Sequence, residues 1–108
     1  MEIELQGQGF LNADALAQHA QRRLHYVLSH RSDCIRRIVL RLGGTNGRRG
    51  YQDMYCLVQV HLIDALVATV IDIGTDIHVV IDRAADRVGR LVAERLAQAR
   101  CDRQRVAA

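Results

Sequence analysis

Hydrophobic and polar residues alternate at the start of the chain and then change to a helical spacing. Residues 2–6 alternate with a period of two, with Ile3 and Leu5 on one side, which predicts a half-buried strand. From about residue 13 to residue 30, apolar residues recur at steps of three and four, which predicts a helix with one apolar face. Asn12 is the expected N-cap of this helix.

Three further stretches have the pattern of strands. Residues 35–42 and 53–62 alternate, whereas residues 66–73 are almost continuously apolar, so the pattern leaves open which of their side chains face inward. The glycine-rich stretch 43–50 has the composition of a long hairpin loop. Asp64-Ala65 is expected to turn the chain between the last two strands.

A second long helix is expected from a capping segment at residues 74–76 to about Arg100. Its apolar positions form one stripe. They are Ile77, Ile81, Ala84, Ala85, Val88, Leu91, Val92 and Leu96.

The order of these elements, β-α-β-β-β-α, predicts an α+β fold with a four-stranded sheet. A right-handed crossover places the first helix on one face of the sheet. The terminal helix most simply joins it there, so both helices are expected on one face and the other face is left open.

Length and composition fit one small domain. The 108 residues have room for a single core, which we expect within residues 1–100, followed by a short, arginine-containing, disordered tail at 101–108. No apolar stretch approaches the roughly 20 residues of a membrane span, and the acidic N-terminus does not have the pattern of a signal peptide. We therefore expect a cytoplasmic protein. Three widely spaced cysteines, an odd number, are expected to be reduced thiols.

Charge is distributed unevenly along the chain. Residues 22–50 carry eight arginines and one aspartate, residues 51–82 carry five aspartates and no arginine, and residues 83–108 carry seven arginines. All basic residues are arginine, whose guanidinium group binds phosphate in a fork and stacks on bases. If the two helices lie side by side, the two basic blocks can merge into one surface, with most aspartates away from it. Such segregation is typical of a protein that binds a nucleic-acid backbone.

The candidate RNA-binding residues follow from this pattern. Arg83, Arg87 and Arg90 form a stripe opposite the apolar face of the second helix, although a merely solvated face is the alternative interpretation. Arg22 and Arg23 lie near His19, Tyr26 and His30 on the first helix, a mixture of groups on which RNA bases stack. The full set is Arg22, Arg23, Arg37, Arg41, Arg48, Arg49, Arg83, Arg87 and Arg90.

Two segments resemble a known family. Asn46-Gly47, Gly50, Asp53 and Cys56, followed by a Val-x-Val-x-Leu strand, are similar to the hairpin of short ribosome hibernation-promoting factors and the related ribosome-associated inhibitor A family. Residues 81–90 are similar to the second helix of the same family. The order of elements agrees along roughly residues 1–100.

The resemblance implies a fold related to double-stranded-RNA-binding domains. It also implies docking on small-subunit ribosomal RNA, in the channel of messenger and transfer RNA, with translation blocked while the protein is bound. Family members often have Lys-Arg between the hairpin Asp and Cys, where this chain has Met54-Tyr55. Because long members add a dimerising domain, we expect this short form to be a monomer or a weak homodimer.

Two other classes of function were weighed. No nucleophile elbow, phosphate loop or metal motif occurs, so we expect no catalytic residue, metal or cofactor, and we do not interpret the chain as an enzyme. The alternative is a protein-interaction or dimerisation module that has lost ribosome binding. Such a module would use the open sheet face, with Val39, Leu57 and Tyr55.

Overall fold

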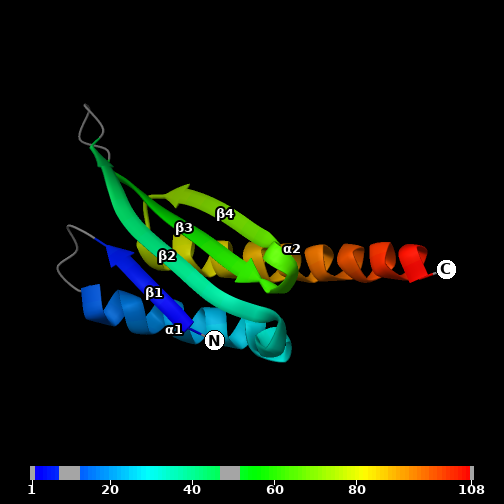
Figure 1. The fold of residues 1–108 in the computed structure, drawn as a ribbon. Helices are drawn as coiled ribbons and strands as arrows, with labels where there is room; N and C mark the ends of the chain where they lie inside the picture. Colours follow the sequence, from blue (N-terminus) through cyan, green and yellow to red (C-terminus); the bar gives the residue numbers. More distant parts are fainter. Residues whose placement is uncertain (1, 8–12, 47–51, 108) are drawn as a thin grey trace.

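A four-stranded sheet and two long helices make up the computed structural model, which describes residues 2–7, 13–46 and 52–107 (Figure 1). The elements in chain order are β1 (Glu2–Gly7), α1 (Ala13–Leu28), η1 (Ser29–Cys34), β2 (Ile35–Asn46), β3 (Gln52–Leu62), η2 (Ile63–Ala65), β4 (Val67–Gly74) and α2 (Ile77–Ala107), where η1 and η2 are short 3₁₀ helices. The predicted order β-α-β-β-β-α is confirmed.

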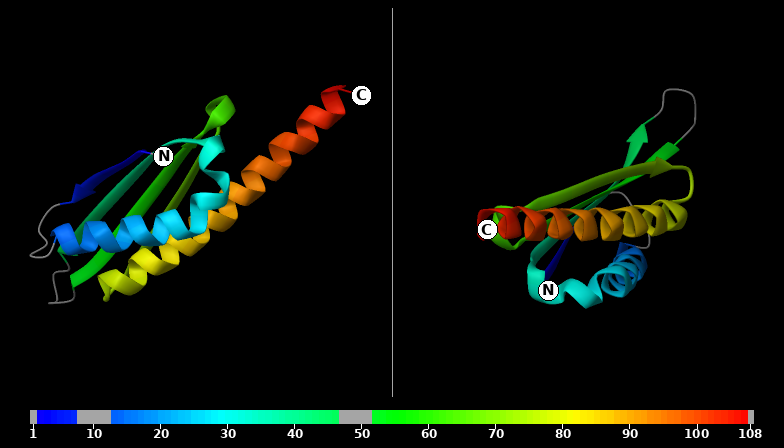
Figure 2. Two further views of the ribbon diagram at one scale, coloured as in Figure 1. Left: turned by 90° about the horizontal axis from the view of Figure 1, so that it is seen from below. Right: turned by 90° about the vertical axis from the view of Figure 1, so that its right-hand side faces the viewer.

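The strands lie side by side in the order of the sequence. β1 runs parallel to β2, which requires the crossover through α1, while β2, β3 and β4 form antiparallel pairs. Both helices pack next to each other on one face of the sheet, as Figure 2 shows from below. The predicted placement of the two helices on one face is therefore confirmed, and β1 and β4 are the edges of the sheet.

The core lies between the sheet and the two helices. Alternate side chains of β2 and β3 point into it, including Ile38 and Val60, which are fully buried. Leu24 and Leu28 of α1 are buried in the same core, on the side of the helices. Burial of one such side chain contributes about 1.5–3 kcal/mol, so this alternation accounts for the choice of register in β2 and β3.

The structure resolves the orientation of β4, which its apolar sequence left open. Ala68 and Val70 are buried against α2, whereas Ile71 and Ile73 point to the open face and are 50% and 54% exposed. β4 therefore carries an apolar row on each face, and only one row has a partner within the described part of the chain.

Two element boundaries differ from those predicted. β2 continues through Gly43 and Gly44, which pair with Tyr55 and Met54. Gly43 lies beneath the Tyr55 ring, where a Cβ atom would come within 2.4 Å of Tyr55 Cε1. Glycine therefore serves here as a strand residue that admits an aromatic ring, and residues 43–46 of the expected loop belong to β2.

α2 begins as predicted but ends later. Asp76 Oδ1 accepts a hydrogen bond from the backbone N–H of His78 at 3.0 Å, so Asp76 is the N-cap. The helix continues to Ala107, well past Arg100, and extends beyond the sheet (Figure 1). Residues 101–107 of the expected tail are thus part of α2. The segment contains no glycine or proline after Gly89, and its alanines, arginines and glutamines favour helix.

Candidate nucleic-acid interface

Ion pairs join the two helices where the sequence predicted a basic surface. Arg23 of α1 places its Nε atom 3.3 Å from Asp82 Oδ1 and donates from Nη2 to Asp86 Oδ1 at 3.0 Å. His19 Nε2 lies 2.8 Å from the same oxygen of Asp82. The positive charge of Arg23 is therefore already paired with two carboxylates of the same chain.

The expectation that most aspartates lie away from the helix surface is wrong for Asp82. Asp82 and Asp86 are one turn apart on α2, on the flank that faces α1. The sequence pattern located the apolar side of α2 but did not show which polar flank would meet α1, because that depends on how the helices pack.

Arg83 and Arg87 point to the other flank of α2, toward the edge of the sheet. Arg83 Nη2 donates to the carbonyl oxygen of Ile73 at 3.2 Å, and Arg87 Nη1 donates to that of Ile71 at 2.9 Å. Both side chains thus bind backbone atoms of β4, a role that the sequence did not predict.

Arg37 and Arg41 lie on the open face of the sheet, opposite the helices. Their neighbours Ile38, Leu40 and Leu42 point inward, so the alternation of β2 turns the arginines outward. Arg37 pairs with Glu4 of β1. Arg48 and Arg49 lie outside the described residues. The structure therefore does not bring those of the predicted arginines that it describes together on one surface.

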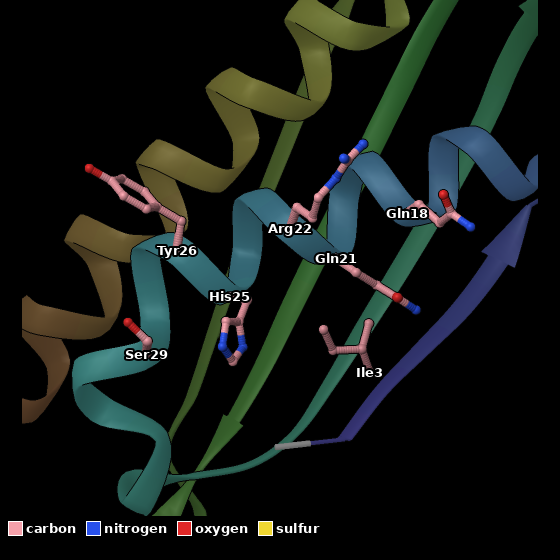
Figure 3. Close-up of a pocket in the computed structure, with 7 residues that line it drawn as sticks. All are labelled: Ile3, Gln18, Gln21, Arg22, His25, Tyr26 and Ser29. Carbon is pink, nitrogen blue, oxygen red and sulfur yellow. The ribbon is translucent and has the colours of Figure 1, made fainter.

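Arg22 borders a groove between α1 and β1. The groove has a volume of about 870 Å³ and is lined by Ile3, Gln18, Gln21, Arg22, His25, Tyr26 and Ser29. Gln21 and His25 lie around Ile3, whereas Tyr26 extends from the opposite side of α1 (Figure 3). Tyr26 is 75% exposed, and the Arg23 guanidinium lies 6.0 Å from the centroid of its ring. This arrangement offers an exposed ring and a nearby cation, on which an unpaired base can stack.

Arg90 borders a second hollow, where the end of α1 meets α2. This crevice of about 500 Å³ is lined by Val27, Arg31, Asp86, Gly89, Arg90 and Ala93. A Cβ atom on Gly89 would lie 3.2 Å from Val27 Cβ, so glycine lets the helices approach closely here. Arg31 and Arg90 form no ion pair within the described residues, while Asp86 is neutralised by Arg23.

Sequence reasoning missed Arg31. It lies in η1 with a non-helical backbone, so no periodicity connected it with the arginines of α2. Its only signal was membership of the first basic block.

The two residues that replace the family's Lys-Arg point to opposite faces of the sheet. Met54 packs against the core, whereas Tyr55 lies over Gly43 on the open face. A lysine at position 54 would have to leave the core to reach water. The two positions therefore do not form one surface, and only Tyr55 could be replaced by a cation at the open face.

Two observations on the described residues concern metal binding and the reactivity of a cysteine. No group of three or more His, Cys, Asp or Glu side chains that could hold a metal ion occurs among them. Cys56 is fully buried, and desolvation, with a smaller effect of the Asp72 charge, raises the pKa of its thiol from 9.0 to about 12. A thiol with so high a pKa is a poor nucleophile. Neither helix of the described chain has the length and apolar character needed to cross a membrane.

This fold, a mixed four-stranded sheet covered on one face by two helices, also occurs in solved structures of other proteins. The structure matches a ribosomal subunit interface protein from Coxiella burnetii with a TM-score of 0.75 and 18% identity, over 90% of this chain and 99% of that one. It also matches the Protein Y N-terminal domain of Thermus thermophilus with a TM-score of 0.64 and 20% identity, over 85% of this chain and 96% of that one. These neighbours confirm the fold that the hairpin and helix motifs implied. The sequence matches no protein-family model and no curated protein.

Proposed function

We propose that this chain is a ribosome-associated translation inhibitor, a hibernation factor that acts in the cytoplasm by binding small-subunit ribosomal RNA. The observation that carries this proposal is the likeness of fold to a ribosomal subunit interface protein along nearly the whole of both chains. The hairpin and helix motifs support it from the sequence, because they resemble the same kind of protein. The proposed activity is occupation of the RNA surface and requires no catalytic step.

The helix layer is the proposed RNA-binding surface. Of the predicted arginines, Arg22 and Arg90 lie on this layer without an ion pair among the described residues, and Arg31 joins Arg90 at the crevice. Tyr26 lines the groove, is exposed and could stack on a base. RNA helices are recognised mainly by shape and phosphate position, so a few well-placed guanidinium groups and an exposed ring suit such a target.

The proposal predicts that the purified protein inhibits cell-free translation in a dose-dependent manner. At 0.1 M salt, the counterions released by one phosphate contact strengthen binding by a factor of about eight. About eightfold more Arg22→Ala protein than wild type should therefore be needed for the same inhibition. Arg36→Ala is the matched control, because it removes the same charge from an exposed position at the start of β2. Undiminished translation with protein in excess over ribosomes would contradict the proposal.

The open sheet face supports a second candidate, a protein-interaction module. Ile71 and Ile73 are about half exposed there, beside Tyr55 and Leu57 of β3. An association through this apolar face should survive moderate salt, whereas binding to RNA phosphates should weaken steeply. Salt dependence therefore separates the two candidates.

A further inference from the structure

The outer edge of β4 is one of the two edges of the sheet. β4 is the last strand in the sheet order, with β3 on one side and no strand on the other within the described chain. Unpaired backbone groups on such an edge are a template for pairing with a strand of another molecule. The exposed Ile71 and Ile73 would add apolar contact to such pairing.

Side chains already occupy three of the backbone groups on this edge. The carbonyl oxygens of Ile71 and Ile73 accept hydrogen bonds from Arg87 and Arg83, as described above. The backbone N–H of Ile73 donates to Asp72 Oδ1 at 2.8 Å. The other oxygen of Asp72 lies 3.1 Å from Arg83 Nε, so the carboxylate and the guanidinium fix each other.

The spacing of the two arginines fits the spacing of the two carbonyl groups. Four residues along a helix rise about 6 Å, and two residues along a strand rise about 6.6 Å. Arg83 and Arg87 on α2 therefore stand opposite Ile73 and Ile71 on β4. Gly74 helps this approach, because a Cβ atom there would lie 2.8 Å from Arg83 Nη2.

We propose that Arg83, Arg87 and Asp72 block the outer edge of β4. They thereby prevent this edge from pairing with β4 of a second copy of the chain. Antiparallel pairing of two such edges presents the same surface from both molecules, which makes a closed two-fold dimer. In the wild type this pairing would have to displace hydrogen bonds from charged donors, so the chain stays monomeric. This inference does not depend on ribosome binding.

The test is the oligomeric state of Arg83→Ala/Arg87→Ala, measured by sedimentation velocity over a range of concentrations. We expect its dimer dissociation constant to fall about tenfold for each displaced hydrogen bond, relative to wild type. Arg90→Ala/Arg95→Ala is the matched control, because it removes two charges from exposed positions of the same helix that form no hydrogen bond to β4 among the described residues. If the double variant does not fold, the single variant Arg87→Ala can be compared with wild type instead. It removes only the hydrogen bond to the carbonyl oxygen of Ile71.

A further substitution identifies the surface involved. Adding Ile71→Lys to the double variant should restore the monomer, since a lysine on an exposed strand edge opposes pairing. The proposal is overturned if the double variant stays as monomeric as wild type. It is also overturned if dimerisation persists unchanged with Ile71→Lys, or if the control variant Arg90→Ala/Arg95→Ala dimerises equally.

Discussion

A variant with both Arg31→Ala and Arg90→Ala is expected to bind small ribosomal subunits about 60-fold more weakly than wild type at 0.1 M salt, because each lost phosphate contact removes a factor of about eight there. The two guanidinium groups border one crevice and have no internal ion pair among the described residues, so their charge is available to a phosphate backbone. The slope of log affinity against log salt should become shallower by about 1.8. Titration of labelled protein with subunits at several salt concentrations measures both quantities.

The matched control removes two other exposed arginines. Arg36→Ala/Arg95→Ala produces the same change in net charge from positions outside the crevice. An equal loss of affinity in both double variants would show that net charge alone matters, and the crevice would then have no special part in binding.

Stability is expected to fall at alkaline pH because of Cys56. The pKa of this thiol is about 12 in the folded protein, compared with 9.0 for an unperturbed thiol, because burial opposes the thiolate. Below pH 9 both states hold the proton, and the contribution to stability is fully present. Above pH 9 the unfolded state loses the proton first, so the free energy of unfolding falls by up to about 1.4 kcal/mol per pH unit toward pH 12.

The comparison with Cys56→Val isolates this effect. Groups that titrate elsewhere in the protein act equally on both proteins, so the difference between their stabilities reports the thiol. Between pH 9 and pH 11 the wild type should lose about 2 kcal/mol more than the variant in denaturant unfolding. If the free energies of unfolding of the two proteins change with pH in the same way, burial does not raise the pKa of Cys56.

The fold could be predicted from the sequence because its elements follow local patterns. The alternation around Ile38 and Val60 and the three-and-four spacing around Leu24 each specify a face, and the parallel pairing of β1 with β2 follows from the crossover. The sequence did not predict which face of β4 is buried, because Ala68 and Ile71 lie on opposite faces and both are apolar. Only the packing of α2 on one face decides that Ala68 is buried and Ile71 is exposed. The C-terminal end of α2 was missed because no residue there ends a helix.

The candidate site was predicted less well because its charged side chains form hydrogen bonds and ion pairs with residues of other helices and strands. The sequence grouped Arg83, Arg87 and Arg90 as one stripe, yet the first two bind β4 and only the third borders the crevice with Arg31. Arg23 is separated from Asp82 and Asp86 by about 60 positions in sequence but is joined to them by ion pairs. Such pairings depend on helix packing, on which a single sequence pattern carries no information.

The most direct test of the proposed function is co-sedimentation of the purified wild-type protein with isolated small ribosomal subunits at 50 mM and 200 mM salt. We expect the protein to pellet with the small subunits at the lower salt and to be largely released at the higher salt, since phosphate contacts lose affinity steeply over this range. Protein that stays in the supernatant at both salt concentrations would contradict ribosome binding. Protein that pellets equally at both would contradict the arginine surface and favour an apolar contact.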